Sequence, residues 1–339
     1  MNNDLLKSIK ITPLLDSLKL ENIDDDTYFG SKYKNRLSNS RLGLLKTKGV
    51  KAFFEGLKSE YSSSFDFGSH LHELYLQPDS FKLIPVYKPT AKAGLLADYL
   101  YSSEGIIPTD DDIKSASYKV GYYKDKLTPN RLVEFRKKAE PYWRDRYLYE
   151  KDNPPIEGEN RIYTDENSYQ TLCNCLSSLN DNTDIYKLIH PDSIVNPVYS
   201  ANEHTILIDI QVEIPGHEPV IYPFKSKLDN FTIDKDISTI TVNDLKTTSR
   251  PVDMFDLTYF SYQRELAIYS WLLKFCSEKY FGLANPTIKG NFFVVSTVPP
   301  NDTAIYPMTP QLFKSGFEEF KYLLRIVAYY NIIEGYEFS

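Results

Sequence analysis

The chain has 339 residues, of which 42% are hydrophobic and 25% are charged, an ordinary composition for one large globular domain. Its net charge of −7 excludes a histone-like nucleic-acid binder that is held by overall positive charge. Three cysteines cannot form a disulfide framework, and they are one short of the four ligands of a structural zinc or iron–sulfur site. We expect a cytoplasmic protein, because no run approaches the roughly 18 apolar residues of a membrane span and no signal-peptide pattern is present.

The first 150 residues are expected to form a helical N-terminal region. Ser38 or Ser40 can cap a short helix, because serine favours the N-cap position. A second helix is expected over residues 66–77, where a proline stops it. Residues 88–150 are expected to form several helices separated by polar turns. A Pro-Pro pair then marks a hinge or boundary, although the whole chain can still be one continuous domain.

Residues 151–339 are expected to form an α/β core. Its first part shows the apolar–polar alternation of half-buried strands, and its later part combines helical patterns with one buried strand. This order predicts an antiparallel meander followed by a helix, a strand and a helix. The expected strands are 205–213, 220–229, 238–246 and 291–297. The expected helices are 166–179, 254–275 and 310–329.

The segment from Lys114 to Tyr147 is locally basic. It contains ten lysines and arginines against four acids, a local charge of +6, with tyrosines and a tryptophan interleaved. Lysine and arginine bind phosphates and aromatic rings stack on bases, so this composition is typical of a sequence-tolerant nucleic-acid surface. A solvated helical face is an equal alternative. The candidate DNA contacts here are Lys119, Lys124, Lys126, Arg136 and Lys137.

Two carboxylates and a lysine are spaced so that a β-hairpin brings them together. Asp244 and Lys246 lie two apart in one apolar run, and side chains two apart in a strand share a face. Asp229 ends the preceding run and converges on them if the two runs pair across a turn at 230–238. Two carboxylates and an amine suit a divalent metal and the activation of a water, the chemistry of phosphodiester hydrolysis. The alternative is a salt bridge at a strand end.

Other side chains can join this group. Glu213 ends the preceding strand and is either a further carboxylate at the same sheet end or a surface glutamate. Glu265 and Tyr269 lie four apart on the helix that follows, so they share a face, and Glu265 should point into the site more than Gln263 does. The 66–77 helix contains two histidines, one of which can reach a metal.

Together these pieces resemble the PD-(D/E)xK nuclease superfamily, and most of all its phage exonucleases of the lambda-exonuclease, RecE (exodeoxyribonuclease VIII) and RecB-nuclease type. The resemblance covers roughly residues 36–82 and 205–297. The motifs that carry it are Gly68-Ser-His-Leu-His72 followed by Pro78, Lys227-Leu-Asp229, Val242-Asn-Asp244-Leu-Lys246-Thr-Thr248 and Arg264-Glu-Leu-Ala-Ile-Tyr269.

The resemblance implies a restriction-endonuclease-like core, in which helices flank a central mixed sheet, and a bound Mg²⁺ or Mn²⁺. It implies His72, Asp229, Asp244 and the Leu245 carbonyl as metal ligands, Lys246 as the residue that positions or activates the water, and Glu265 and Tyr269 as supports for the phosphate or the lysine. The family usually has a glutamine where this chain has Glu265. Arg41 lies in a segment that also resembles the family, and it is either a phosphate contact or a surface arginine.

The function implied is metal-dependent DNA exonuclease activity in phage recombination or DNA processing, in the host cytoplasm, without an iron–sulfur cluster. The implied partners are duplex DNA with a free end, further copies of the chain, and a single-strand annealing or other recombination protein. Three alternatives stay open. They are a structure-specific or nicking endonuclease, a non-catalytic DNA-binding protein that kept the fold, and a nuclease that acts on RNA.

Overall fold

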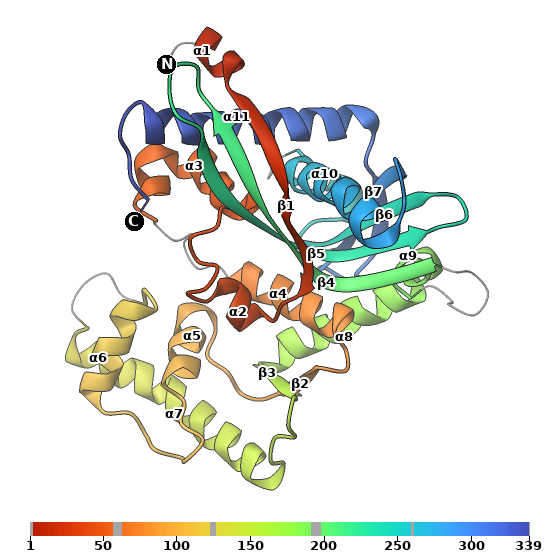
Figure 1. The fold of residues 1–339 in the computed structure, drawn as a ribbon. Coiled ribbons are helices and arrows are strands. Elements are labelled where there is room, and N and C mark those ends of the chain that lie inside the picture. Colours follow the sequence, from red (N-terminus) through yellow and green to blue (C-terminus); the bar gives the residue numbers. More distant parts are fainter. Residues whose placement is uncertain (1–2, 57–62, 123–126, 191–197, 259–260, 339) are drawn as a thin grey trace. The chain divides into compact units, whose positions relative to one another are not determined.

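The computed structural model describes residues 3–56, 63–122, 127–190, 198–258 and 261–338 (Figure 1). The chain divides into two compact units, each with its own hydrophobic core. The first unit contains Met1–Ser59 and Leu179–Ser339, and the second contains Glu60–Ser178. Within these ranges, no helix is both long enough and apolar enough to cross a membrane.

The first unit is built on a six-stranded sheet in the order β1-β4-β5-β6-β7-β8. Neighbouring strands are antiparallel except β6 and β7, which are parallel. The predicted mixed sheet flanked by helices is therefore confirmed. The strands are β1 (Lys10–Asn22), β4 (Val198–Glu213), β5 (Val220–Asp234), β6 (Thr239–Thr248), β7 (Thr287–Ser296) and β8 (Thr303–Pro307).

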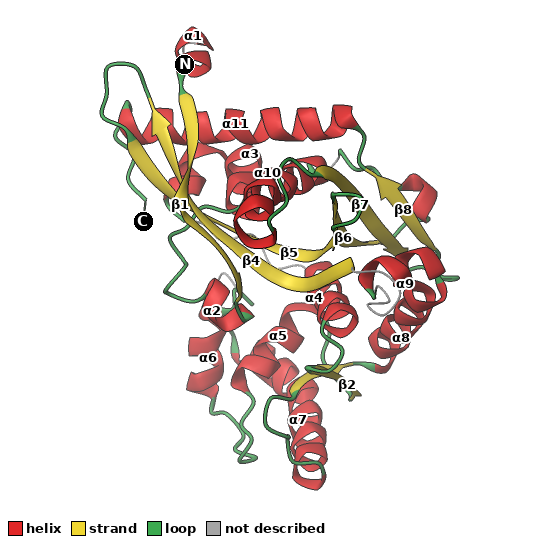
Figure 2. Ribbon diagram, turned by 45° about the vertical axis from the view of Figure 1, so that its right-hand side comes forward, coloured by secondary structure: helices red, strands yellow, loops and turns green. Residues whose placement is uncertain are grey.

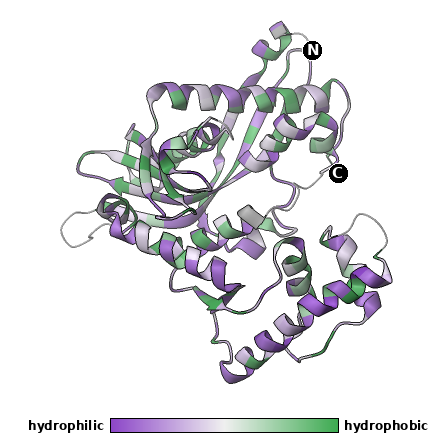
Figure 3. Cartoon of the chain, turned by 180° about the vertical axis from the view of Figure 1, so that it is seen from behind, coloured by the Kyte–Doolittle hydropathy of each residue, from purple (hydrophilic) through white to green (hydrophobic). Residues whose placement is uncertain are grey.

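Three helices of the first unit pack into the main core with the sheet: α3 (Asn39–Phe54), α10 (Tyr262–Phe281) and α11 (Pro310–Ile332). In Figure 2, α10 lies in the concave side of the strongly curved sheet. Figure 3 shows α11 alternating hydrophobic and hydrophilic residues, as expected of a helix with one buried face. The shorter elements are α1 (Asn3–Ser8), α2 (Asp25–Phe29), α9 (Thr183–Ile189) and a 3₁₀ turn (Val252–Met254).

Local capping explains where two of these helices begin. The Ser38 hydroxyl accepts a hydrogen bond from the Arg41 N–H at the start of α3, so the predicted cap is confirmed. Thr309 caps α11 in the same way, with Pro310 in the first helical position. Both signals are local, so they are readable in the sequence without knowledge of the fold.

The N-terminal region differs from its expected helical form. Lys10–Asn22 is the edge strand β1, paired with β4 across an irregularity between Leu14 and Lys19. Pro13 is tolerated there because an edge strand leaves one row of N–H groups unpaired. The strand places the beginning of the chain in the same unit as residues 179–339, rather than in a helical extension.

Among its described residues, the second unit contains four whole helices, most of a fifth, and a two-stranded parallel sheet. Strand β2 (Phe81–Pro85) pairs with β3 (Asn160–Thr164), which joins the chain across the Pro-Pro stretch expected to be a boundary. The boundaries between the two units therefore lie near residues 59 and 178, and not near residue 150. The helices within this unit are α4 (Ser63–Leu76), α5 (Ala91–Leu100), α6 (Asp110–Lys119) and α7 (Pro129–Asp152), and α8 (Glu166–Asp181) leads out of it.

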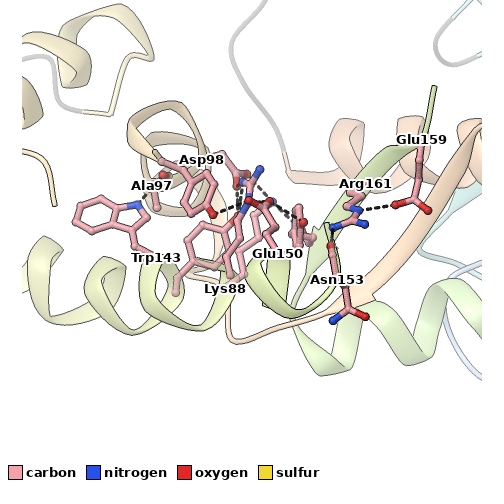
Figure 4. A network of polar contacts seen from close by, with 12 residues as sticks. Lys88, Ala97, Asp98, Trp143, Glu150, Asn153, Glu159 and Arg161 are labelled. Atoms are coloured by element: carbon pink, nitrogen blue, oxygen red, sulfur yellow. Dashed lines mark hydrogen bonds and ion pairs between the residues drawn. The ribbon is translucent and has the colours of Figure 1, made fainter. Parts of the chain in front are cut away.

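A largely buried polar network joins α5, α7 and β3 in the second unit (Figure 4). Arg146 donates to Glu150 at 3.0 Å and to Asp98 at 3.2 Å, and Lys88 Nζ lies 2.6 Å from Asp98. The Tyr142 hydroxyl also donates to Asp98. Two cations face two carboxylates, so the charges of this network balance.

The hydrogen-bonding capacity of the network is also used. Glu150 accepts from Tyr101 and Tyr163 at 2.6 and 2.7 Å, and the Arg146 guanidinium stacks on both rings at about 4 Å from their centroids. Burial by itself raises the pKa of Glu150, but the hydrogen bonds from these three partners bring it below its ordinary value. Arg146 is therefore part of the folded core of this unit and not of a basic surface.

Candidate active site

The sheet of the first unit opens into a fork between β5 and β6. The two strands pair only from Asn230 to Asp234, which face Thr239–Asn243. Beyond that point β5 continues along β4, while β6 continues along β7. Asp229 and Asp244 are the first residues past the end of the β5–β6 ladder, so both carboxylates lie where the strands separate. We call this place the fork.

A hydrogen bond crosses the fork where the backbone ladder ends. The Leu245 N–H donates to Asp229 Oδ2 at 2.8 Å. Asp229 thus replaces a backbone acceptor and is held against β6, next to Asp244. The predicted convergence of Asp229 on Asp244 is confirmed as geometry, although β5 runs on to Asp234 and the turn is shorter than expected.

Lys246 joins the strand carboxylates to helix α10. Its Nζ lies 2.6 Å from Asp244 Oδ2 and 3.3 Å from Glu265 Oε2. The Tyr269 hydroxyl donates to Glu265 Oε1 at 3.0 Å. The structure therefore brings together Asp229, Asp244, Lys246, Glu265 and Tyr269, as their spacing predicted.

The start of α10 is anchored so that Glu265 points into the fork. The buried Arg264 donates to Asn39 Oδ1 at 2.7 Å and pairs with Glu319 at 2.9 Å, which ties α10 to α3 and α11. Gly316 of α11 packs so closely on α10 that an added Cβ would lie 2.2 Å from the Gln263 carbonyl oxygen. Gln263 approaches Glu319 rather than Lys246. Glu265, and not Gln263, is therefore the residue that contacts the lysine.

The pKa values of Asp244 and Lys246 are raised, because the fork contains more acidic than basic side chains. Burial raises the pKa of Asp244 well above its usual range, and the charges of Asp229 and Glu265 raise it further against the opposing effect of Lys246. Burial alone lowers the pKa of Lys246, but the three carboxylates raise it well above its ordinary value. Lys246 is therefore a cation, and Asp244 readily takes up a proton when no other cation is near.

Glu203 belongs to this group although the sequence reasoning missed it. It lies on β4 directly opposite Asp229, between the paired positions Asn202–Asn230 and His204–Leu228. Oxygens of the Glu203 and Asp229 carboxylates approach within 4.8 Å, and Lys227 Nζ lies 2.7 Å from Glu203.

A left-handed backbone at Glu203, with φ of 56°, interrupts the regular strand. The polar residues before Thr205 do not resemble a strand, so the expected strand began too late. Counting pairs back from the turn that joins β4 to β5 is the signal that could have placed residue 203 opposite Asp229.

Glu213 lies at the other end of β4, so of its two predicted roles the further carboxylate beside Asp229 is wrong. It pairs with Lys10 and accepts a hydrogen bond from Gln211 at 2.8 Å. Because β4 and β5 are antiparallel, the end of β4 meets the beginning of β5. Glu213 is about 33 Å along the strand from Glu203 at roughly 3.3 Å per residue.

The two remaining predicted metal ligands are His72 and the Leu245 carbonyl. His72 lies on α4 in the second unit, so its role beside the carboxylates of the first unit stays a prediction. Leu245 lies opposite Phe293 in the β6–β7 ladder, and its carbonyl as a ligand also stays a prediction.

The predicted DNA contacts fall into three groups. Arg41 stacks on Phe53 and Phe338, and Arg136 is bound to Asp110 and to the Pro108 carbonyl, so both guanidinium groups already have partners within the protein. Lys137 is exposed on α7, and the exposed Lys119 lies over the Tyr99 ring. Lys124 and Lys126 fall outside the described residues. DNA contact by any of them stays a prediction.

The oxygens of the fork fit a hard divalent cation. Four carboxylates (Glu203, Asp229, Asp244 and Glu265) face two lysines (Lys227 and Lys246), and Lys227 also pairs with Asp25, which leaves an excess of negative charge. Asp244 Oδ1 is buried and has no hydrogen-bond partner among the described residues. A buried carboxylate oxygen without a donor is costly unless a cation binds it, and Mg²⁺ prefers such oxygen ligands.

No protein-family model and no curated protein matches the sequence. Among solved structures, a "putative exonuclease" from Eubacterium rectale is similar at 11% sequence identity and a TM-score of 0.43, over 91% of this chain and 87% of that one. The protein named SSO0001 is similar at 12% identity and a TM-score of 0.26, over 79% of this chain and 88% of that one. Likenesses at these TM-scores are too distant to assign a function, which has to be argued from the site.

Proposed function

We propose that this protein is a divalent-metal-dependent deoxyribonuclease that hydrolyses phosphodiester bonds at the fork. The observation that supports this most is the arrangement of Asp244. Its carboxylate is buried, has one oxygen without a hydrogen-bond partner, and forms an ion pair with Lys246 beside two further carboxylates. Such a strongly perturbed acid next to a buried lysine is typical of a catalytic site.

Asp229, Asp244 and Glu203 would hold Mg²⁺ or Mn²⁺, with His72 and the Leu245 carbonyl as further ligands. The bound ion would lower the pKa of a water and neutralise charge on the scissile phosphate. Glu203 is the addition that the geometry makes to the expected ligand set, because its carboxylate faces that of Asp229. Lys227 would hold Glu203 in place from the side.

Lys246 would orient the attacking water. The neighbouring carboxylates keep its amine protonated, so it acts first as a hydrogen-bond donor and as a counter-charge to the phosphate. Glu265 replaces the usual family glutamine, and its negative charge is compensated by Lys246 at 3.3 Å and by the Tyr269 hydroxyl at 3.0 Å. Its carboxylate would take the proton that the water loses as the new P–O bond forms and the bond to the leaving nucleotide breaks.

Exonuclease action on duplex DNA, and a place in phage recombination or DNA processing, rest on the resemblance of the motifs around His72, Asp229, Asp244 and Lys246. The exposed Lys119 and Lys137 support a path for DNA over the second unit. A homo-oligomer and a recombination protein as partners belong to the same proposal.

End-labelled linear duplex and covalently closed circular DNA, each with Mg²⁺, Mn²⁺ or EDTA, provide the test. We expect the linear duplex to be degraded only with metal and the closed circle to stay intact. Asp244→Ala and Lys246→Ala should abolish this activity, whereas Glu213→Gln, at the other end of β4, should retain it. Cleavage of closed circles would favour a nicking or structure-specific endonuclease, and full activity of both alanine variants would contradict the proposed site.

A further inference from the structure

A row of four asparagine side chains crosses the sheet beside the fork. Asn291 on β7 donates to Asn243 on β6 at 3.0 Å, and Asn243 donates to Asn230 on β5 at 2.7 Å. Asn230 donates in turn to Asn202 on β4 at 2.7 Å. We call these four residues the asparagine ladder. Each inner amide is both donor and acceptor, so the ladder runs in one direction across four strands.

Each strand carboxylate of the fork is the chain neighbour of a ladder residue. Adjacent residues of a strand point to opposite faces, so the ladder on one face backs the carboxylates on the other. The neighbouring pairs are Asn202 with Glu203, Asn230 with Asp229, and Asn243 with Asp244.

The ladder holds the strands at the point where their backbone pairing is weakest. Asn230 and Asn243 are the last paired residues before β5 and β6 separate. Their side chains are fully buried, with exposures of 0% and 1%, so both amides need hydrogen-bond partners within the protein. These come from the row and, for Asn230, also from the Ser200 hydroxyl, to which it donates at 3.1 Å. A shift of one strand relative to the other would break the hydrogen bonds of the row and leave buried polar groups without partners.

We propose that Asn230 and Asn243 are positioning residues that fix the spacing of Asp229 and Asp244 for a divalent cation. They touch neither the cation nor the substrate, and they act through the strands that carry the carboxylates. The proposal rests on the proposed function only for the identity of the ligand. Partners that orient metal ligands from behind commonly change metal affinity by about 10–100-fold when they are removed.

The experiment is calorimetric titration of the full chain with Mn²⁺ alone, combined with thermal unfolding in EDTA. The variants are Asn243→Leu, Asn230→Leu and the double variant with both changes. Thr232→Val is the matched control, because Thr232 pairs with Thr241 on the same face, two residues farther from the fork. The control should bind Mn²⁺ as the wild type does.

Each single variant removes the Asn243–Asn230 hydrogen bond and leaves one buried polar group of the partner amide unpaired, so it should lower both stability and Mn²⁺ affinity. The double variant removes both groups of the central hydrogen bond, although Asn291 and Asn202 at the ends of the row each lose a partner, so its unfolding temperature should recover part of the loss seen in the single variants. Its Mn²⁺ affinity should nevertheless stay about 10–100-fold below that of the wild type, because the link that sets the spacing is gone. The double variant also decides the question if a single variant fails to fold.

Recovery of both stability and affinity in the double variant would overturn the proposal, because the ladder would then act on the fold alone. DNA hydrolysis by the wild type together with wild-type Mn²⁺ affinity in the double variant would overturn the ladder's role and leave the proposed function standing. Mn²⁺ binding by the wild type without hydrolysis would contradict the proposed function, while the same titrations still decide the ladder. A wild-type chain that binds no Mn²⁺ would overturn both.

Discussion

Two clusters of charged side chains in this molecule differ in whether their charges balance and their hydrogen bonds are complete. This difference distinguishes a structural network from a candidate site. In the second unit, Lys88 and Arg146 face Asp98 and Glu150, and tyrosine hydroxyls complete the hydrogen bonds. In the fork of the first unit, four carboxylates face two lysines, and one oxygen of Asp244 has no hydrogen-bond partner among the described atoms. The first cluster is balanced and satisfied, and the second is neither.

The comparison shows that burial of charge alone does not indicate function. A balanced network stabilises the native arrangement because removal of either partner leaves the other uncompensated. An unbalanced cluster costs stability in the absence of a counter-ion, and folding tolerates that cost when the cluster has another role.

The two tryptophans allow each unit to be followed separately, since Trp143 lies in the second unit and Trp271 in the first.

The largest expected effect is on activity. Asp244→Asn should lower metal-dependent hydrolysis at least about 100-fold, the lower range for removing one electrostatic group of a catalytic site. The same change should raise the free energy of unfolding in EDTA on the order of 1 kcal/mol, because it removes an acid from an acid-rich cluster. Hydrolysis assays and urea unfolding followed through Trp271, in a Trp143→Phe background, measure the two effects. A loss of stability equal to that of a balanced ion pair would remove the distinction between the clusters.

The second effect is a loss of stability when the balanced network of the second unit is broken. Arg146→Met should destabilise the second unit by about 3 kcal/mol, the low end for breaking a buried ion pair, because 20% of the arginine side chain stays exposed. Urea unfolding followed through Trp143, in a Trp271→Phe background, measures the change. Arg144→Met is the control, since Arg144 is 69% exposed on the same helix. Equal stability of the two variants would contradict a structural role for the network.

The third effect tests the charge imbalance directly. Mn²⁺ at about 100 times its Kd should stabilise the first unit by about 2.7 kcal/mol through binding to the folded state. The shift should be absent in Asp244→Asn, and the Trp271 signal measures it. A simultaneous shift of the Trp143 signal would support participation of His72 from the second unit. Stabilisation of Asp244→Asn as large as that of the wild type would place the metal elsewhere.

The smallest effect concerns Lys225, a buried cation whose contacts are the Tyr28 carbonyl and two aromatic rings. Burial, with the nearby charges of Arg36 and Arg41, lowers the pKa of Lys225 to about 8. The unfolded chain therefore binds more protons than the folded one above pH 8, and stability should rise with pH by about 1–2 kcal/mol between pH 8 and 9.5.

Lys225→Met should remove this rise, which urea unfolding at several pH values measures through Trp271. The upper limit of about pH 9.5 avoids the tyrosines, whose titration in the unfolded chain begins near their usual pKa of about 10. The control is an exposed lysine of the same unit, and Lys48→Met should leave the rise in place. A slope that persists in Lys225→Met would show that another group carries it.

Local patterns predicted much of the fold. The alternation of apolar and polar residues located β4, β5 and β6, and the predicted cap at Ser38 or Ser40 located the start of α3. Strand β1 was missed because its apolar residues do not alternate regularly, and its pairing with β4 is a contact between residues far apart in the chain. Edge strands are specified largely by the partner that they join.

The candidate site divides in the same way. Spacing placed Asp244 with Lys246 and Glu265 with Tyr269, because strand and helix periods fix which near neighbours share a face. Spacing could not show which end of β4 meets Asp229. It offered Glu213 as either a further carboxylate or a surface glutamate, whereas the antiparallel register brings Glu203 to Asp229. It also counted Arg146 and Arg136 in a basic segment that was either a nucleic-acid surface or a solvated helical face, whereas tertiary contacts pair them with Asp98 and Asp110.

The sequence by itself determined the group of side chains at the fork that lie a few residues apart on one strand or one helix. The tertiary structure alone decided which distant residues join that group, where the β5–β6 pairing stops, and which buried charges are balanced. The physical reason is that periodicity is a property of the local backbone. Register and charge balance are instead set by contacts between strands and helices that are far apart in the chain.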